Sequence, residues 1–494
     1  MCMTSLSTLL QGITEVPSVF DVTIHGLRTH SRHVRPGDAF VALAGSATPA
    51  AHYMDDAIDS GAIVIILDVD AAAPCYEYRG ALVVPVRGLR GHLGRIADRF
   101  FEHPSRRLRV VGVTGTNGKT SVSHFIAQLL SATGMPCGVL GTLGYGMPGN
   151  LRTASHTTPD VVEVNRALFS VIGEGGRAVA MEVSSHALDQ GRVDDLSMIG
   201  AVFTNLTRDH LDYHGSMEAY GRAKASLFLR EGLHFAVINF DDPFGRQLYE
   251  RTEGLCDRIR YSLHEPQTEL WMTAFTPSAD GFEASLDGHW GRFNVAAPLM
   301  GSFNASNLLA AMATVLSLGV SPGAVAEAVP ALVAPAGRLE RYTSANGVTA
   351  VVDYAHTTDA LANALAALRP HVRGRLICVF GCGGDRDTGK RPEMGREAEK
   401  GADRVIVTDD NPRSESPEAI VREILAGIDD IGAVTVIHDR ADAIRQAIDS
   451  AVPGDVVLVA GKGHEAWQER HGARVPFSDV AHVRDALGLE EGVA

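Results

Sequence analysis

The ten residues "GVTGTNGKTS" at positions 112–121 have the composition of a phosphate-binding loop. Gly115 and Gly118 lack a Cβ, so the backbone there can come close to phosphate oxygens. Lys119 has the length to reach the terminal phosphates of a nucleotide, and Thr120 can offer its hydroxyl to Mg²⁺. The stretch therefore predicts a nucleotide site.

The spacing departs from the usual pattern, which has a glycine five residues before the Gly-Lys pair where this chain has Val113. The flanking sequence nevertheless favours a nucleotide site. "LRVVGV" (108–113) predicts a buried strand before the loop. After the loop, a helix ending near Gly134 is predicted from an apolar face made by Val122, Phe125, Ile126, Leu129 and Leu130. The unpaired N–H groups and the dipole at a helix N-terminus favour an anion. A plain tight turn is the alternative.

Two stretches further along carry acidic and imidazole side chains. Glu182 ends the predicted strand "RAVAMEV" (177–183), where a carboxylate can hold Mg²⁺ opposite a phosphate loop or cap the next helix. "TNLTRDHLDYHG" places His210 and His214 at helical spacing. Zinc is conceivable there, but no third ligand of the right kind is evident, and a solvated polar turn is the alternative. Lys224 on pattern alone is a helical lysine.

The C-terminal third contains several polar clusters after apolar runs. "GCGGDRDTGKRP" (381–392) follows an apolar strand and predicts an anion site. "DDNPR" (409–413) has the chemistry of a turn. "GKGHE" (461–465) repeats the Gly-Lys pair without Ser or Thr, so it does not predict a second phosphate loop. Earlier in the chain, Asn304 and Asn307 begin a predicted helix, where they can cap it or read a nucleobase edge.

The composition is that of a water-soluble globular protein of several domains. The chain has 494 residues, of which 45% are hydrophobic and 21% charged. A net charge of −15 disfavours nonspecific binding to nucleic acid or to an anionic membrane. Six cysteines without CxxC pairs indicate reduced thiols in the cytoplasm. We expect no signal peptide and no membrane span, because no apolar run approaches about 18 residues.

Strands and boundaries predict three α/β domains, at 1–104, 105–337 and 338–494. "HPSRRLR" (103–109) suits a linker, and "VAPAGRLERY" marks the second boundary. Further strands are predicted at 38–43, 62–67, 81–86, 200–206 and 235–239, with β-hairpins between about 255 and 300 and a helix over 304–319. The last domain has five apolar strands, at 348–354, 375–381, 404–410, 433–439 and 455–461. Helical segments separate most of these five strands, which predicts a doubly wound, Rossmann-like parallel sheet with ligands at the carboxyl ends of its strands.

Taken together, these motifs resemble the Mur ligases, the ATP-dependent amide-forming family of peptidoglycan precursor synthesis. "TGTNGKTS", "HTTPD", "MEVSSHAL", "FTNLTRDHLDYHG", "FNASN", "GRLE", "DYAH", "GCGGDRDTGKRP", "DDNPR" and "GKGHE" occur in the family's order, from about residue 30 to 470. Within the family the chain is most similar to the members that add the third residue of the stem peptide. The resemblance implies a small UDP-binding domain, a central ATP-binding domain like those of P-loop ATPases, and an amino-acid-binding domain.

The resemblance also implies roles for individual residues. ATP and its phosphates are held by Gly115, Thr116, Asn117, Gly118, Lys119, Thr120, Ser121, Asn304, Arg338, Asp353 and His356. Mg²⁺ is bound by Thr120, Glu182, His210 and Lys224, the last as an N6-carboxylysine (a carbamate), and Lys119, Glu182, His210 and Lys224 are the catalytic group. The UDP-N-acetylmuramoyl-dipeptide is held by Ser31, Arg32, Thr157, Thr158, Ser184, Gln190 and Arg192. The incoming amino acid is held by Arg386, Asp410, Asn411, Arg413, Gly461 and Glu465.

Three positions depart from the family pattern. "HSR" at 30–32 stands in place of Asp-Ser-Arg, and "TPAAHYM" at 48–54 lacks the Asp-Gly pair before His52. Thr358 occupies a usual proline position, which changes the stiffness of that loop and not its chemistry.

We therefore expect a cytoplasmic, monomeric, ADP-forming ligase acting on UDP-N-acetylmuramoyl-L-alanyl-D-glutamate through an acyl phosphate. Arg413 favours meso-2,6-diaminopimelate as the added amino acid, because a guanidinium can bind the extra carboxylate that L-lysine lacks. The alternatives are the same ligase adding L-lysine, a folylpolyglutamate synthetase, the Mur ligase that adds a D-alanyl dipeptide, a P-loop ATPase that drives binding or motion, and a catalytically inactive binding protein. No nucleic acid or membrane partner is expected.

Overall fold

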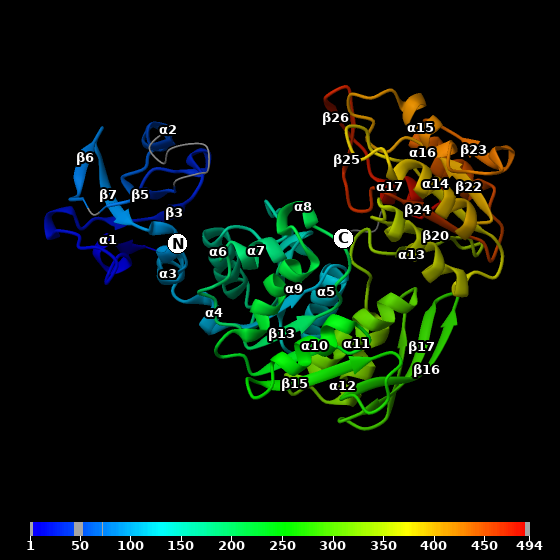
Figure 1. The fold of residues 1–494 in the computed structure, drawn as a ribbon, viewed down its shortest axis with the longest axis horizontal. Coiled ribbons are helices and arrows are strands. Elements are labelled where there is room, and N and C mark those ends of the chain that lie inside the picture. The colour runs from blue at the N-terminus through cyan, green and yellow to red at the C-terminus, as the bar shows by residue number, and fades with distance from the viewer. Residues whose placement is uncertain (1–2, 44–52, 72, 490–494) are drawn as a thin grey trace. The chain divides into compact units, whose positions relative to one another are not determined.

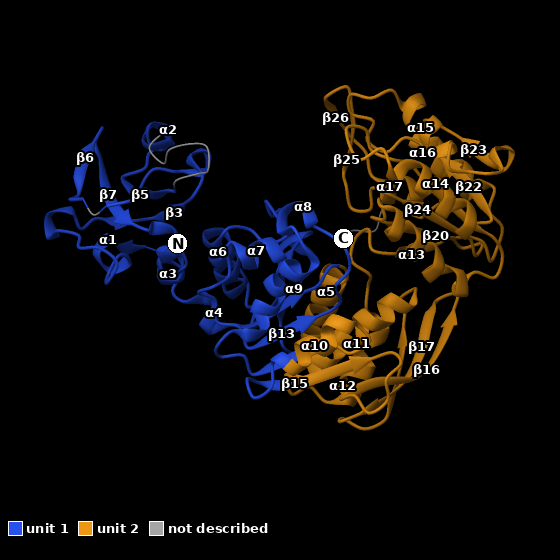
Figure 2. Ribbon diagram, in the orientation of Figure 1, with its two compact units in different colours: residues 1–116, 134–236, 251–257 blue, residues 117–133, 237–250, 258–494 orange. Residues whose placement is uncertain are grey.

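The computed structural model describes residues 3–43, 53–71 and 73–489, so the departure at 48–52 lies outside the described residues. The chain divides into two compact units (Figure 2). Unit 1 comprises residues 1–116, 134–236 and 251–257, and unit 2 comprises residues 117–133, 237–250 and 258–494. Each unit is described by itself.

Unit 1 begins with a five-stranded sheet (Figure 1). Its order is β3 (Gly26–Arg28), β4 (Asp38–Ala42), β5 (Val64–Val69), β7 (Ala81–Arg87) and β6 (Tyr76–Tyr78). All neighbours are parallel except β6 and β7. Alternate residues of the strands enter two separate cores, one shared with α1 (Leu6–Leu9) and α3 (Leu93–Phe100), the other with α2 (Met54–Asp59). The predicted strands at 38–43, 62–67 and 81–86 are confirmed.

A second set of strands in unit 1 surrounds the start of the glycine-rich loop. The order is β11 (Asn150–Arg152), β10 (Gly144–Met147), β9 (Cys137–Gly141), β12 (Ala178–Glu182), β8 (Arg109–Thr114) and β13 (Gly200–Phe203). The last four are parallel. Central strands of such sheets are buried on both faces, and β8, β9, β12 and β13 accordingly read as short apolar runs. The helices of this part are α4 (Pro104–Arg107), α6 (Val161–Gly173), α7 (Ser185–Asp189), α8 (Leu211–His214) and α9 (Met217–Ala225).

In unit 2, helix α5 (Lys119–Ala132) follows the loop and packs against α11 (Ser302–Ser317). The five apolar residues predicted for one face of α5 are all fully buried. The antiparallel strands β16 (Leu270–Ser278), β17 (Gly281–Gly288) and β18 (Phe293–Ala297) confirm the expected hairpins, and α10 (Pro243–Arg251) and α12 (Pro322–Ala328) complete this part. Strand β14 (Phe235–Asn239) confirms the prediction at 235–239, and β15 (Asp257–Ser262) pairs with β16 in parallel.

The C-terminal sheet of unit 2 confirms the doubly wound prediction. Its order is β19 (Glu340–Thr343), β20 (Thr349–Asp353), β24 (Val456–Ala460), β21 (Leu376–Phe380), β22 (Arg404–Val407) and β23 (Val434–Val436), and all neighbours are parallel except β19 and β20. One face packs on α13 (Thr358–Leu368), α14 (Lys390–Gly401) and α15 (Pro417–Leu425). The other packs on α16 (Arg440–Asp449) and α17 (Asp479–Ala486). A hairpin of β25 (Trp467–Arg470) and β26 (Ala473–Pro476) follows β24.

The fold is therefore α/β throughout. The domain boundaries at 104 and 338 stay a prediction, because the two compact units do not correspond to three domains. Within the described residues, none of the helices has the length and apolar character needed to cross a membrane. Five of the six cysteines lie in the described part, and all five are free thiols.

Candidate functional site

The glycine-rich loop has the backbone that its sequence predicts. Gly115 has φ +154°, and a Cβ there would lie 1.9 Å from the Thr204 hydroxyl, so no other residue fits without displacement. Gly118 has φ +85° and is the N-cap of helix α5, whose first residue is Lys119. The structure thus places Lys119 and Thr120 in the first turn of a helix, where N–H groups and the dipole favour an anion.

Lys224 is buried against the start of this loop. Its side chain is 1% exposed, and Nζ donates a hydrogen bond of 2.7 Å to the carbonyl oxygen of Gly115. The ammonium also lies 4.4 Å from the centre of the Tyr220 ring, one turn earlier on α9. The Tyr220 hydroxyl lies 3.2 Å from the hydroxyl of Thr116. A lysine that pattern alone left as an ordinary helical residue is therefore part of the loop's surroundings.

Tyr220 is a residue that the sequence prediction missed. It is 1% exposed, and burial raises the pKa of its phenol to about 12. Its ring contacts Lys224, and the ring centres of His210 and His214 lie 6.1 and 5.2 Å away. The i, i+4 spacing of Tyr220 and Lys224 on a predicted helix was the available signal.

Glu182 is buried beside the strand that leads into the loop. In the register of β12 and β8, Glu182 pairs with Val113, and its side chain is 1% exposed. The backbone N–H of Thr142 donates to one carboxylate oxygen at 2.8 Å, and the Thr142 hydroxyl donates to the other at 3.1 Å. Ser184, and not Glu182, caps the following helix α7, so the alternative of a capping acid is wrong.

His210 sits in a group of aromatic rings. It has φ +53° and precedes α8, and its ring centre lies 4.8 Å from that of His186. Burial lowers the pKa of His186 and also that of His214, which keeps both imidazoles neutral near pH 7. In the described part of the chain, no group of three or more His, Cys, Asp or Glu side chains is arranged to hold a metal ion.

The residues expected to hold the muramoyl-dipeptide form one hydrogen-bonded network in unit 1. The Thr158 hydroxyl donates to the Glu182 carbonyl at 2.8 Å and accepts from the Ser184 N–H at 3.0 Å. Arg192 donates to the Thr158 carbonyl at 2.7 Å and to the Gln190 side chain at 3.0 Å. The Thr157 hydroxyl lies 3.1 Å from the Thr142 hydroxyl, which connects Thr157 to the same network. The structure thus brings these five predicted residues together, next to Glu182.

Ser31 and Arg32, expected on the uridine side, lie in the short helical turn η2 (Ser31–His33) after β3. Arg32 is exposed. Two residues before Ser31, the Thr29 hydroxyl donates at 2.8 Å to Asp160, which caps helix α6. Sequence reasoning missed this link between two motifs that are 131 residues apart.

Three of the predicted ATP-side residues of unit 2, Arg338, Asp353 and His356, lie beside Tyr354. Asp353 accepts hydrogen bonds of 2.8 Å from the N–H groups of Leu339 and Ala355. Burial raises its pKa to about 6, against the opposing effect of the Arg338 guanidinium. Arg338 lies 5.3 Å from the centre of the Tyr354 ring, and the His356 ring lies 4.5 Å from it.

Asn304 lies on helix α11, where it is 1% exposed. Its amide donates to the Met300 carbonyl at 3.0 Å and accepts from the Asn307 amide at 3.2 Å. Gly301 is the N-cap of α11, so neither asparagine serves as the N-cap.

Five of the six predicted amino-acid-binding residues lie at the carboxyl ends of β22 and β24. Asn411 is 4% exposed and donates to the Glu465 carboxylate at 3.0 Å. Gly461 packs against Asp410, since a Cβ on Gly461 would lie 2.6 Å from an Asp410 carboxylate oxygen. Burial raises the pKa of Asp410 despite the cations of Arg440 and Lys462. Arg386 lies on the exposed loop that follows β21.

Lys462, which the sequence prediction left without a role, is fully buried within this cluster. It donates to the Asn411 side chain at 3.0 Å and to the Glu465 carboxylate at 2.9 Å. Burial opposes ionisation of Glu465, but Lys462 and Asn411 outweigh it, and the pKa of Glu465 lies below its ordinary value. Glu465 is therefore an anion held in one orientation.

Arg413 is not the solvated turn residue that local sequence would allow. Its side chain is 23% exposed. It donates at 2.6 Å to the Gly384 carbonyl, in the loop after β21, and lies 3.7 Å from the Glu469 carboxylate. Its φ is +54°, an uncommon conformation for a residue with a long side chain. The structure thus joins "GCGGDRDTGKRP" and "DDNPR" through this side chain.

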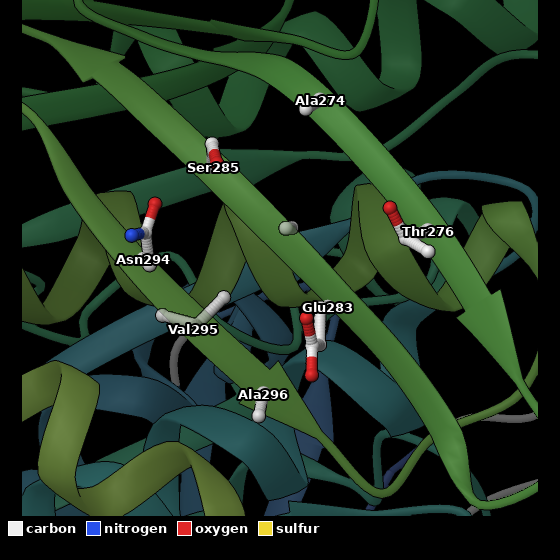
Figure 3. A pocket seen from close by; sticks show the side chains of 8 residues that line it. Ala274, Thr276, Glu283, Ser285, Asn294, Val295 and Ala296 are labelled. Atoms are coloured by element: carbon white, nitrogen blue, oxygen red, sulfur yellow. The ribbon is translucent and has the colours of Figure 1, made fainter.

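A shallow pocket of about 350 Å³ lies on the sheet of β16, β17 and β18 (Figure 3). Its lining comprises Ala274, Thr276, Glu283, Ala284, Ser285, Asn294, Val295 and Ala296. None of these is a predicted site residue, and small side chains dominate, so the pocket adds nothing to the site.

The fold and these clusters define an α/β nucleotide-binding protein with a loop of the P-loop kind and a separate polar cluster on a doubly wound sheet. Three family profiles match the chain: "Mur ligase family, catalytic domain" at residues 23–101, "Mur ligase middle domain" at 113–315, and "Mur ligase, glutamate ligase domain" at 337–463. The chain belongs to the Mur ligase family, and it is a ligase.

Two relatives are similar over nearly their whole lengths. The UDP-N-acetylmuramoyl-L-alanyl-D-glutamate–2,6-diaminopimelate ligase of Ectopseudomonas mendocina is 49% identical, over 95% of this chain and 96% of the relative. The protein of the same name from Pseudomonas aeruginosa is 48% identical over the same shares. A solved structure of a ligase with this name has a TM-score of 0.73 and 37% identity, and the match covers 98% of this chain and 99% of that one.

Proposed function

We propose that this ligase adds meso-2,6-diaminopimelate to UDP-N-acetylmuramoyl-L-alanyl-D-glutamate at the expense of ATP. The observation that carries the amino-acid assignment is the pair of opposite charges held at the strand ends of unit 2. The Arg413 guanidinium suits a carboxylate, and the Glu465 carboxylate, fixed by Asn411, suits an ammonium. The far end of diaminopimelate carries one group of each kind, whereas that of L-lysine carries only the ammonium. The names of the similar relatives support the same substrates.

ATP is the phosphoryl donor in this proposal. Lys119 and the N-terminus of α5 hold its phosphates together with residues 115–118, Thr120 and Ser121. Asn304 and Arg338 contact the nucleotide, and Asp353 and His356 lie near its ribose or phosphates. The hydrogen bonds from Leu339 and Ala355 support this role for Asp353, because they fix the orientation of its carboxylate.

Mg²⁺ is the proposed metal, since Glu182 and Thr120 offer hard oxygen donors and His210 an imidazole. When bound, Mg²⁺ neutralises the clustered charge of the phosphates and the reacting carboxylate. Glu182 fits this role because its buried carboxylate is oriented by two hydrogen bonds from Thr142. As an ammonium, Lys224 does not fit a metal site. As a carbamate it would add an anionic oxygen donor, and we propose that modification.

The protein's own residues then position the reactants for two steps. The carboxylate of the dipeptide's glutamate attacks the γ-phosphorus of ATP, which forms an acyl phosphate and releases ADP. The amine of the incoming amino acid attacks the acyl carbon, loses a proton, and displaces phosphate. Thr157, Thr158, Ser184, Gln190 and Arg192 hold the dipeptide next to Glu182, and Arg386 holds the carboxylate beside the attacking amine. Alignment of the reactants supplies much of the acceleration.

The uridine end of the substrate is proposed to lie near Ser31 and Arg32, in a domain formed by residues 1–104. The central ATP-binding domain then comprises 105–337 and the amino-acid-binding domain 338–494. We place the enzyme in the cytoplasm as a monomer, where ATP and its nucleotide-linked substrate are available.

The test is to incubate the protein with ATP, Mg²⁺, UDP-N-acetylmuramoyl-L-alanyl-D-glutamate and one amino acid, and to weigh the product. We expect the mass of the diaminopimelate adduct and ADP release that depends on the amino acid. ADP release without the amino acid would favour a P-loop ATPase. An L-lysine adduct formed equally well would leave the ligase standing and remove the diaminopimelate assignment.

A further inference from the structure

Arg413 has a backbone conformation that its neighbours must hold. A φ of +54° is unfavourable for a residue with a long side chain, and such conformations persist only where the surrounding structure over-determines them. The hairpin of β25 and β26 supplies that support. The Arg413 N–H donates to the Glu469 carbonyl at 3.0 Å, and the His471 N–H donates to the Arg413 carbonyl at 2.7 Å. Arg413 thus forms an isolated parallel bridge with Arg470.

The same hairpin holds the residues just before Arg413 through the side chain of Gln468. Gln468 is 7% exposed, and its amide nitrogen donates to the Asp410 carbonyl at 2.7 Å and lies 3.3 Å from the Asp409 carbonyl. The next residue, Glu469, donates its N–H to the Asn411 side chain at 2.9 Å. Residues 409, 410, 411 and 413 are therefore each hydrogen-bonded to the hairpin of β25 and β26.

We propose that Gln468 is a positioning residue for recognition of the incoming amino acid. This inference rests on the proposed function. The Gln468 amide binds the backbone from which Asn411 and Arg413 project, so it sets where the guanidinium of Arg413 can meet a carboxylate. Gln468 acts through Arg413. Loss of its two donor contacts lets residues 409–413 relax away from β25 and weakens binding of the group that distinguishes diaminopimelate from L-lysine.

The alternative is that Gln468 only satisfies two buried carbonyls and stabilises the fold. The two roles differ in what they change. A positioning role changes the KM for diaminopimelate and the preference over L-lysine, while the KM values for ATP and the nucleotide-linked dipeptide stay constant. A purely structural role lowers the melting temperature and changes all three substrates together or none.

The experiment compares the wild-type enzyme with Gln468→Met, which keeps the length and removes the donors. We expect the KM for meso-diaminopimelate to rise roughly tenfold, the size of effect given by lost neutral hydrogen bonds, with the other two KM values within about twofold. Gln446→Met, the same change on the exposed surface of α16, is the matched control and should leave all three values unchanged. If Gln468→Met does not fold, Gln468→Asn, which withdraws the amide by one methylene, is measured in the same way.

A double-mutant cycle with Arg413→Ala tests whether Gln468 acts through Arg413. In the Arg413→Ala background, Gln468→Met should change the diaminopimelate-to-lysine preference by less than about twofold. An unchanged diaminopimelate KM in a folded Gln468 variant, equal rises for all three substrates, or an undiminished effect in the Arg413→Ala background would each overturn the inference. A wild-type enzyme without any preference would instead overturn the proposed amino acid.

Discussion

The ammonium of Lys224 donates a 2.7 Å hydrogen bond to the carbonyl of Gly115, a glycine of the nucleotide loop where a Cβ would clash with the Thr204 hydroxyl. The Lys224 side chain projects from helix α9 toward the loop, and the Tyr220 ring on the preceding turn packs against the Lys224 ammonium. A fully buried lysine is costly unless its charge is compensated or changed. The position therefore favours a functional over a surface lysine, which is consistent with the proposed carbamate.

Replacement of Lys224 by alanine should reduce turnover on the order of 10²-fold or more, because an oriented charged group in a buried site is lost. Short carboxylates such as acetate should restore part of the activity, since they can stand in for the carbamate. Product formation is the measurement, with a thermal melt to show that the variant is folded. Lys400→Ala, on a largely exposed side chain, is the control and should behave like wild type. Turnover of Lys224→Ala close to that of wild type would remove Lys224 from the mechanism.

Lys119→Ala should abolish ADP formation, by roughly 10³-fold, and leave the fold intact. Lys119 begins α5, and the fully buried residues Val122, Phe125, Ile126, Leu129 and Leu130, not this side chain, anchor the helix. ADP release is measured with a coupled assay, and circular dichroism checks the fold. A folded variant that still turns over at a near-normal rate would show that this loop does not hold the phosphates.

The strands and the main helices could be predicted from local sequence, because their signals are local. The apolar face of α5 and five of the six strands of the C-terminal sheet follow from hydrophobic periodicity, which burial on one or both faces imposes. The glycines at 115 and 118 marked a turn with special backbone geometry. The order of the strands in each sheet, however, depends on contacts between segments far apart in the sequence, and no periodicity encodes it.

The site was predicted mainly from the resemblance to a family, and the structure shows why local chemistry was insufficient. Lys224 and Tyr220 meet the loop from a helix about one hundred residues later. Thr142 orients Glu182 from the turn after β9, 40 residues earlier. Gln468 holds Asp410 from 58 residues later. These partners have ordinary residue types at ordinary positions, so only the folded arrangement reveals them.

The raised pKa of Asp353, about 6, predicts a pH dependence of nucleotide binding. As pH falls through about 6, Asp353 gains a proton and the Arg338 guanidinium loses the carboxylate near it. We therefore expect the KM for ATP to rise below pH 6, by up to roughly tenfold. Asp353→Asn should have a raised KM at all pH values and no inflection near pH 6. The same inflection in the variant would assign it to another group.

The free energy of unfolding should respond to the charge of Asp353 in the opposite direction from nucleotide binding: the charged carboxylate favours ATP binding but lowers stability. Its folded pKa lies above the ordinary value of 3.8, so the folded state holds this proton more tightly than the unfolded state does. Its contribution to stability is therefore present below about pH 4 and is lost as pH rises to about 6. Thermal melts of wild type and Asp353→Asn across this range should diverge in that direction, with wild type losing stability relative to the variant as pH rises.

The buried ion pair of Arg440 and Asp479 predicts a large effect on stability. Both side chains are fully buried, with two contacts of 2.7 Å, and Arg440 also donates to the Ala460 carbonyl at the end of β24. Arg440→Met leaves the aspartate buried without its partner and should cost about 3–5 kcal/mol. Calorimetric or denaturant unfolding measures this.

The exposed pair of Arg445 and Asp442, on the same helix α16, offers the matched control. Arg445→Met should cost less than about 1 kcal/mol, because water screens an exposed pair. The double variant Arg440→Met with Asp479→Leu should recover much of the lost stability, since it removes both buried charges. Equal small losses for Arg440→Met and Arg445→Met would mean that the buried pair does not hold α16 and α17 to the sheet.

Arg413 should decide which amino acid is added. Meso-diaminopimelate and L-lysine differ by one carboxylate at the far end, and a guanidinium can bind a carboxylate with two parallel hydrogen bonds. The wild-type enzyme should therefore prefer diaminopimelate strongly, because a site built around a charged contact rejects an analogue that leaves its own groups unpaired. Comparable kcat/KM values for the two amino acids would contradict this assignment and leave the ligase activity untouched.

Arg413→Ala should lower kcat/KM for diaminopimelate on the order of 10²-fold and change that for L-lysine by less than about threefold, because only the former loses a charged hydrogen bond. Arg413→Lys is the informative second variant. It keeps the charge but cannot make the forked contact with a carboxylate or repeat the bond to the Gly384 carbonyl in the same geometry. An intermediate preference for Arg413→Lys would show that charge and geometry both contribute. Equal losses of kcat/KM for both amino acids in Arg413→Ala would instead show that Arg413 maintains the conformation of residues 409–413. Another cation would then bind the distal carboxylate.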